Sequence, residues 1–502
     1  MRESNNQTTS SNYASPCRLN IRLEKDKQSV RLLGLDFGST TSSALVAQAR
    51  IVMNSTTGNL QLGDTQIIYR SEISFTPFNE DNTIDETRVI ELMDNWLTGC
   101  GMQPSDFFSG GVIITGLAAR RKNAEKLAKL IEERIGDIVV ATADDPSLES
   151  WLAFMGSCGA LSRYHKEIPI INLDIGGGTT NPALGLNGNV LSTGCHFIGA
   201  RHIQFVPSTY QIRALTDDAK QLFTTLNIHK RVGEVLNQEE LNRFIGFYIQ
   251  ALEQIVQGHT AFFKTAHDQL IEQVPFELPT LNQPAAITFS GGVGELVYQA
   301  SSGKALPATT YFGDLGIDFA KAILQSPILS SSLKTIIPEN HGRATVYGLA
   351  LHSTEVSGAT LFLPKPEVLP LRHLPIIAHL SAYDSVSELS AALQLVSKHP
   401  QGACLQVTLK TAEHPTVTLD TIRNLGHTLV VIFKQLQPPA DQPIVLLIDC
   451  NVGKSLGSYA TAWGQLPVNL IVIDEVTIPQ ANFVNISKPH QQVVPVSFYG
   501  IK

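Results

Sequence analysis

The sequence is poor in the features that mark secreted, membrane and nucleic-acid-binding proteins. Its six cysteines lie far apart and form no CxxC pair, so we expect reduced thiols rather than a zinc site or disulfides. No apolar run approaches the length of a bilayer span, and the polar N-terminus lacks a signal core, so we expect no membrane partner and no export. The net charge of −8 argues against general nucleic-acid binding, which needs excess Lys and Arg.

Length and composition describe a globular protein of more than one domain. The chain has 502 residues, with 43% hydrophobic and 16% charged residues, and one hydrophobic core rarely serves so long a chain. Residues 1–30 are rich in Ser, Thr, Asn, Gln and charge, which bury too little apolar area to offset the entropy of ordering. We therefore expect a mobile polar tail followed by two or three domains.

Two segments of the chain repeat one pattern. Residues 33–42 (LGLDFGSTTS) and 172–181 (NLDIGGGTTN) each run from apolar residues to Asp, then glycine, then hydroxyls. This order predicts a strand whose tip holds phosphate. Since each copy is followed by residues that can form a hairpin, the repeat predicts two homologous halves that close on one nucleotide and its metal.

In the first copy, Asp36 stands at the predicted strand tip, where it can hold hydrated Mg²⁺. Gly38 lets the backbone approach phosphate, and the following hydroxyls and amides can bind its oxygens. Those hydroxyls belong to Ser39, Thr40 and Thr41. Thr115, which ends a later predicted strand, is a secondary candidate for the same cleft. The alternatives are an ordinary hairpin turn and an ordinary strand end.

The second copy repeats these roles, and a third glycine cluster follows it. Asp174 is the counterpart of Asp36 as a metal ligand, and an Asn187-Gly188 turn predicts the hairpin. The predicted phosphate-binding residues are Gly176, Gly177, Gly178, Thr179 and Thr180. A further strand runs into Gly291, Gly292 and Gly294, which offer a flat backbone surface for an adenosine.

A helix that begins near residue 146 joins the two halves. Asp145 and Glu149 stand at its start, and we predict that one of them orients a water against the γ-phosphate, with Asp145 also a metal ligand. The alternative for Asp144 or Asp145 is a helix cap. Small residues at 153–160 and in a helix over 342–351 predict close contact between two connector helices at a hinge.

Taken in this order, the motifs resemble the actin/Hsp70/hexokinase-type ATPase fold over residues 31–356. Within that superfamily, the sequences of the motifs are most similar to those of the ethanolamine ammonia-lyase reactivating factors. The residues that carry this resemblance are 173–181 with Asn181, 114–116 before 119–124, 343–348 running on to 352–358, and 369–375. Ala200, where that family usually has a second glycine, and Pro182, within a predicted strand, depart from the pattern.

The resemblance implies an α/β fold with two duplicated ribonuclease-H-like halves around a nucleotide cleft, plus a smaller C-terminal α/β region. It implies ATP and Mg²⁺ as cofactors and a slow, chaperone-like ATPase that releases damaged cobalamin from inactivated ethanolamine ammonia-lyase. The setting would be the bacterial cytoplasm near an ethanolamine microcompartment, and a homo-oligomer is compatible with it. A small-molecule kinase and an actin-like scaffold are the alternative functions.

The predicted domains are residues 1–30 (tail), 31–165 (first half), 166–358 (second half) and 359–502 (C-terminal region). Apolar runs in the last region lie at residues 402–409, 429–433, 444–448 and 470–473. Its segment 449–455 (DCNVGKS) is similar to a phosphate-binding P-loop, but the required first glycine would fall at Ile448. We therefore interpret it as a strand-to-helix turn with Lys454 exposed.

Overall fold

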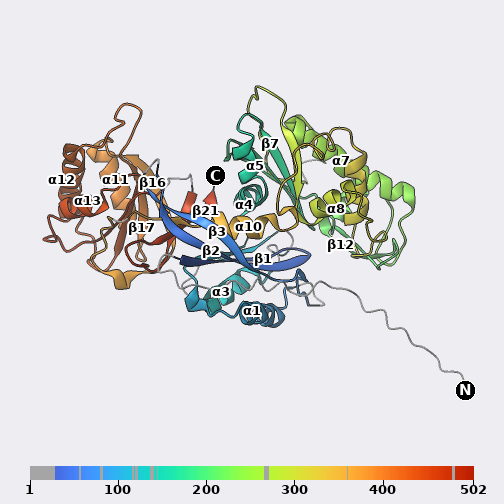
Figure 1. Ribbon diagram of the computed structural model, residues 1–502, viewed down its shortest axis with the longest axis horizontal. Coiled ribbons are helices and arrows are strands. Elements are labelled where there is room, and N and C mark those ends of the chain that lie inside the picture. The colour runs from blue at the N-terminus through green and yellow to red at the C-terminus, as the bar shows by residue number, and fades with distance from the viewer. Residues whose placement is uncertain are drawn as a thin grey trace, which may run out of the picture.

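The computed structural model describes most of the chain as three units (Figure 1). The described residues are 29–55, 58–79, 83–115, 118, 122–135, 141–143, 145–264, 271–358, 360–476 and 481–501. The predicted tail up to residue 28, Asp144 and the motif residues 116 and 119–121 lie outside them. Within this described part, no helix is long and apolar enough to cross a bilayer.

The first half is a mixed sheet in the order β3-β2-β1-β5-β6, with β4 paired to β2. Strand β1 is antiparallel to β2 and parallel to β5, because the β1–β2 link is a tight turn whereas β5 follows a helical crossover. Helices α1 and α3 cover one face with a hydrophobic cluster. The bounds are β1 Ser29–Phe37, β2 Thr41–Met53, β3 Leu60–Arg70, β4 Ser74–Phe75, α1 Glu86–Cys100, β5 Ser109–Ile114, α3 Ala124–Ile135 and β6 Ala141–Ala143.

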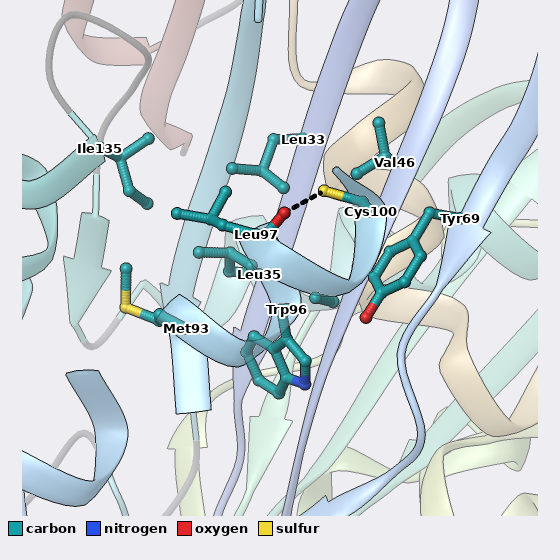
Figure 2. A pocket seen from close by; sticks show the side chains of 10 residues that line it. Leu33, Leu35, Val46, Tyr69, Met93, Trp96, Leu97, Cys100 and Ile135 are labelled. Atoms are coloured by element: carbon teal, nitrogen blue, oxygen red, sulfur yellow. Dashed lines mark hydrogen bonds between the residues drawn. The ribbon is translucent and has the colours of Figure 1, made fainter. Parts of the chain in front are cut away.

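Helix α1 packs tightly on this sheet. Its N-cap Asp85 accepts the amide of Arg88, and Gly101 ends it in the left-handed region. A cavity of about 10 Å³ remains between α1 and the sheet, lined by apolar side chains such as Trp96 and Met93 (Figure 2). So small and apolar a space holds no ligand and stays dry.

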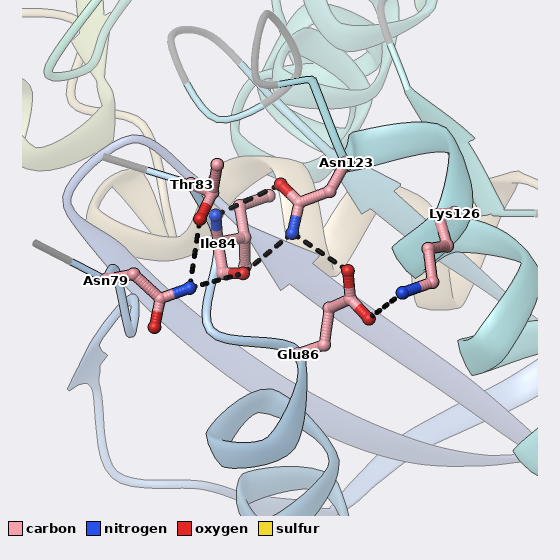
Figure 3. A network of polar contacts seen from close by, with 6 residues as sticks. All are labelled: Asn79, Thr83, Ile84, Glu86, Asn123 and Lys126. Carbon is pink, nitrogen blue, oxygen red and sulfur yellow. Dashed lines mark hydrogen bonds and ion pairs between the residues drawn. The ribbon is translucent and has the colours of Figure 1, made fainter. Parts of the chain in front are cut away.

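A polar network ties the start of α1 to the start of α3 (Figure 3). The side-chain amide of Asn123 donates to the carbonyl of Ile84 at 2.7 Å and to Glu86 at 3.0 Å. Lys126 completes the network with an ion pair to Glu86 at 2.7 Å. These contacts fix the two helices that lie beneath the strand carrying Asp36.

The second half repeats the central topology of the first. Its sheet runs β13-β10-β8-β7-β14, with β9 paired to β8. Here β7 takes the place of β1, antiparallel to β8 and parallel to β14. The bounds of its strands are β7 Ile170–Ile175, β8 Thr180–Leu186, β9 Asn189–Thr193, β10 Cys195–His196, β11 Ile203–Phe205, β12 Ile212–Leu215, β13 Glu272–Val274 and β14 Ala286–Ser290. The bounds of its helices are α6 Asp217–Thr225, α7 Gln238–Gln257, α8 Gly291–Ser301 and α9 Gly316–Gln325.

Two connector helices, α4 (Pro146–Ser157) and α10 (Ala344–His352), lie between the sheets. Helix α10 packs on the first sheet, and α4 packs on the second. They cross where a Cβ on Gly156 would overlap the carbonyl of Ala344 and one on Gly348 would overlap that of Leu152. The predicted close contact of the connectors is therefore confirmed, and the predicted α/β fold with two duplicated halves is confirmed as well.

The C-terminal unit is a seven-stranded sheet in the order β15-β21-β20-β16-β17-β18-β19. Strands β16 to β19 are mutually parallel and packed against α11, α12 and α13. Since β15 precedes residue 359, this sheet begins inside the predicted second half. The bounds are β15 Glu355–Val356, β16 Leu371–Ser381, α11 Val386–Val396, β17 Ala403–Thr408, α12 Leu419–Leu436, β18 Pro443–Ile448, α13 Gly453–Ala460, β19 Asn469–Ile473, β20 Ala481–Ile486 and β21 Pro495–Ile501. The remaining helix, α5, follows α4 and spans Gly159–Tyr164.

Two local expectations differ from the structure. The connector helix, expected to run on through the small residues 153–160, is interrupted at Cys158: α4 ends at Ser157 and α5 begins at Gly159. The apolar run 429–433 lies inside α12 rather than alternating with helices, because its neighbours keep the helical spacing of buried residues.

Pro182 is accommodated in β8 by a break in the neighbouring strand. Its carbonyl accepts the amide of Gly194, which lies between β9 and β10. Because N–H and C=O of one strand residue point to the same side, the N–H that proline lacks would face this gap. The segment 449–455 forms the predicted strand-to-helix turn between β18 and α13, with Lys454 exposed.

Candidate nucleotide site

The first glycine loop joins β1 to β2 in a tight turn. Gly38 donates its amide to the carbonyl of Thr41 at 3.0 Å, and Thr76 donates its hydroxyl to the carbonyl of Gly38 at 2.7 Å. The hydroxyl of Thr115 lies beside Gly38 and hydrogen-bonds the carboxyl group of Asp36. The secondary candidate Thr115 therefore lies in the same site as Asp36.

The second loop joins β7 to β8 in the same way. Gly176 donates its amide to the carbonyl of Thr179 at 2.9 Å. The buried imidazole of His202 contacts the carbonyl of Gly178 at 2.7 Å and the hydroxyl of Thr216 at 2.8 Å. Since a carbonyl only accepts, the Nε2 of His202 carries the proton toward Gly178. No sequence motif indicated this support, because His202 lies outside every motif.

Ala200, which stands where the similar family usually has a second glycine, does not disrupt the second loop. Ala200 and Arg201 donate their amides to the carbonyls of Gly176 and Gly177 at 3.1 and 2.6 Å. A Cβ at Gly199 would come within 2.5 Å of the carbonyl oxygen of Gly177, so the close approach depends on Gly199. The side chain of Ala200 is tolerated beside it.

The two loops meet. A Cβ on Gly177 would overlap the hydroxyl oxygen of Thr40 and lie 3.3 Å from the Cβ of Ser39. Burial and the charge of Asp174 raise the pKa of Asp36 to about 7, against the lowering effect of the bond from Thr115. Burial raises the pKa of Asp174 to about 6, opposed by the bond from Ser290. The two carboxyl groups are thus close enough to repel each other.

Three buried polar atoms in this region have no hydrogen-bond partner among the described residues: Asp36 Oδ1, Asn181 Oδ1 and Arg201 Nη1. Burial also lowers the pKa of Arg201, although the charge of Asp314 opposes this. An unpaired buried polar atom costs free energy unless a ligand satisfies it. Two acceptor oxygens and a cationic donor beside glycine loops fit a metal ion and a phosphate.

The third glycine cluster lies against the second loop. Gly291 has φ +77°, and a Cβ there would come within 2.6 Å of the carbonyl oxygen of Ile175 at the end of β7. Gly294 packs on the backbone of Phe289, whereas Gly292 faces open space. At the start of α8, the backbone is therefore bare at Gly292, beside the second glycine loop.

A buried polar chain supports Asp174 from below. Ser290 donates to Asp174 Oδ1 at 2.5 Å and accepts from the amide of Asn172 at 2.8 Å. Thr288 donates to Asn172 at 3.1 Å and contacts the thiol of Cys158 at 3.3 Å. No sequence motif singled out Ser290, although its position directly before Gly291 places it at a strand tip like the two aspartates.

The predicted residues on α4 are placed differently. Asp145 is the N-cap of α4: one oxygen accepts the amide of Leu148 at 3.0 Å, and the other accepts the amide of Gly500 at 2.6 Å. The capping alternative is therefore what the structure shows for Asp145. Glu149 lies in the first turn of α4 and is partly exposed.

Comparison with known proteins gives one family and two full-length relatives. The family "Ethanolamine utilisation protein EutA" matches residues 28–501. The chain is 28% identical over 486 residues to "Ethanolamine ammonia-lyase reactivase EutA" of Salmonella typhimurium, covering 93% of this chain and 97% of the relative. The Escherichia coli protein of the same name is 28% identical over 478 residues, with the same coverage. A solved exopolyphosphatase-like protein has TM-score 0.39 and 14% identity, over 64% of this chain and 97% of its own.

Proposed function

Because the chain belongs to the family of the ethanolamine utilisation protein EutA, we propose that it is an ATP-dependent, chaperone-like reactivating factor. It releases damaged cobalamin from inactivated ethanolamine ammonia-lyase so that intact adenosylcobalamin can bind. The names of the two full-length relatives support the reactivase role. The family also supports a place in the bacterial cytoplasm beside an ethanolamine microcompartment.

The observation that carries the ATPase part is the meeting of the two loops. Asp36 and Asp174 would hold Mg²⁺, and the amides and hydroxyls of the loops would bind phosphate. When bound, Mg²⁺ neutralises charge on the phosphate oxygens. The hydroxyls in question are those of Ser39, Thr40, Thr41, Thr179 and Thr180, with adenosine against Gly291, Gly292 and Gly294.

Further residues act around these two carboxylates. Arg201 offers its unpaired Nη1 as a donor to a phosphate oxygen, and Ser290 holds the orientation of Asp174. Glu149 is our candidate for orienting the attacking water, since both oxygens of Asp145 already accept backbone amides. No specific observation in the described residues favours the kinase or the scaffold.

The test is a reactivation assay with cyanocobalamin-blocked ethanolamine ammonia-lyase, Mg²⁺ and ATP. We expect the wild-type protein to restore activity and Asp174→Asn to abolish both ATP hydrolysis and reactivation. Ser301→Ala, which changes a partly buried hydroxyl at the far end of α8, is the matched control. Thermal melting confirms that both variants fold. Failure of the wild-type protein, or equal activity of Asp174→Asn, would refute the proposal.

A further inference from the structure

A second set of carboxylates, of which Asp474 is fully buried, lies in the C-terminal unit at the carboxyl ends of β18 and β19. In open parallel sheets, this edge is where ligands bind. Asp449 ends β18, but both of its oxygens accept backbone amides, from Leu409 at 2.8 Å and Lys410 at 3.2 Å. Asp449 thus closes the end of β17 and is not available to a ligand.

Asp474 and Glu475, which follow β19, are different. Asp474 is fully buried, and its Oδ1 has no hydrogen-bond partner among the described residues. Its Oδ2 accepts the hydroxyl of Thr360 and the amide of Gly453, at the start of α13. Glu475 is held at φ +56°, and its Oε2 is also buried and unpartnered.

The two unpartnered oxygens both lie against Gly358. A Cβ built on Gly358 would lie 2.5 Å from Glu475 Oε2 and 2.8 Å from Asp474 Oδ1. The oxygens are therefore no farther apart than the sum of these distances. Two carboxylates this close in a buried position repel each other unless a positive charge lies between them. The nearby charge of Lys410 acts on Glu475, but Lys410 is exposed.

We propose that Asp474 and Glu475 bind a hard divalent cation, Mg²⁺ or Ca²⁺, which fixes the passage from the ATPase halves to the C-terminal sheet. Gly358 and Thr360 lie in this passage, directly after β15. Gly358 donates its amide to the carbonyl of Asp474 at 2.9 Å, and Thr360 bonds both Asp474 and Asn451. A cation bound by Asp474 and Glu475 would thus act on this segment through the contacts that Asp474 makes with Gly358 and Thr360.

The donor set decides the class of cation. In the described part of the chain, no three His, Cys, Asp or Glu side chains gather into a metal cluster, and the candidate atoms are all oxygens. These oxygens differ from the thiolate and imidazole ligands that zinc prefers. A hard cation that takes two carboxylates and completes its shell with neutral oxygens and water fits this arrangement.

The experiment uses the full chain carrying Asp36→Asn and Asp174→Asn, so that the nucleotide cleft no longer competes. Titration calorimetry with MgCl₂ or CaCl₂, without nucleotide, should show one cation per chain. Adding Glu475→Gln should weaken binding at least ~10-fold, because it removes one of two charged ligands. Glu413→Gln, which changes an exposed carboxylate of the same unit, should leave binding unchanged.

Hydrogen exchange supplies the second measurement. Adding the cation should slow hydrogen exchange at the amides of Gly358 and Thr360 in the chain that carries only Asp36→Asn and Asp174→Asn. It should not slow exchange once Glu475→Gln is added. Absence of binding in the cleft-disabled chain, or equal binding by Glu475→Gln, would overturn the proposal; both results would mean that the pair shares a proton instead. Since neither ATP nor the lyase enters the measurement, failure of the reactivase proposal leaves this test unaffected.

Discussion

At the scale of single residues, the site where the two glycine loops meet holds carboxyl groups in surroundings that disfavour their charged forms. Burial dominates at both Asp36 and Asp174, and their mutual repulsion adds to it at Asp36. A bound cation reverses this balance by favouring the charged forms. The same two side chains that would bind Mg²⁺ therefore make the protein without ligand less stable.

The stability of the protein without ligand should depend on Asp36 and pH. The pKa of Asp36 is about 7 in the folded state against 3.8 for the free group, so the folded state binds more protons between these values. Stability contributed by Asp36 is therefore lost as pH rises from about 4 to about 7. Asp36→Asn should show a smaller fall in Tm over this range and should not bind Mg-ATP. Thermal melting across pH checks this.

The control for Asp36 is Asp64→Asn, which changes an exposed carboxylate that already has φ +48°, a conformation that asparagine tolerates. Its pH profile should match that of the wild-type protein. A profile of Asp36→Asn that also matches the wild-type protein would contradict the shifted pKa.

Ser290 should set the pH at which Asp174 ionises. Its hydroxyl lowers the pKa of Asp174 by donating to the charged form, so Ser290→Ala should raise this pKa further. The midpoint of Mg-ATP binding as a function of pH should move upward, because a charged Asp174 is needed to bind the cation. Ser301→Ala should leave the midpoint in place. An unshifted midpoint in Ser290→Ala would show that Ser290 only fills space.

At the scale of elements, the close crossing of α4 and α10 joins the two sheets. The crossing places backbone against backbone at Gly156 and Gly348, so neither helix can carry a side chain there. Small residues at helical spacing predicted this contact from sequence. The helix break at Cys158 is not predicted, because the small residues around it, Gly156, Ser157 and Gly159, are interpreted as the close-packing surface of one continuous helix.

Gly348→Ala should destabilise the protein. Its Cβ would overlap the carbonyl of Leu152, so the helices must separate, which costs about 1–3 kcal/mol. Gly246→Ala is the matched control, since Gly246 lies inside α7 with no atom within 4 Å of a new Cβ. That variant should be stabilised by about 0.5–1 kcal/mol through helix propensity. Urea unfolding measures both. Equal effects would contradict the close crossing.

At the scale of the whole molecule, the C-terminal sheet reaches the connector of the two duplicated halves. Gly500 in β21 donates to Asp145 at the start of α4, and Ser109 in β5 contacts Thr354 at 2.7 Å. Figure 1 shows the red strand β21 beside α4 and the first sheet. A movement of α4 would therefore change the contacts of the C-terminal unit.

Tyr499→Phe should loosen this contact. The hydroxyl of Tyr499 bonds His373 at 2.6 Å, and His373 also contacts Glu132 of α3 at 3.3 Å. Loss of one hydrogen bond of about 1 kcal/mol should speed hydrogen exchange in the first turn of α4 about 5-fold. Tyr383→Phe, on the exposed side of the C-terminal unit, should not. Unchanged exchange in Tyr499→Phe would show that β21 does not restrain α4.

The duplicated halves and their loops could be predicted from sequence because the signals are local. A strand that ends in Asp, glycine and hydroxyls occurs twice, and the hairpin turn at Asn187 and Gly188 follows its usual chemistry. The family could be predicted as well, and the match to residues 28–501 confirms it. The roles of the individual site residues stay predictions.

The sequence by itself determined the two sheets, the order of the loops and the small residues of the connectors, since each depends on spacing along the chain. Only the tertiary structure decided that the Ser290 hydroxyl donates to Asp174 and that the Gly500 amide donates to Asp145. It also decided that carboxylate oxygens of Asp474 and Glu475 both lie beside Gly358. These contacts join residues far apart in the chain, and no local pattern encodes which polar atoms burial will leave paired or unpaired.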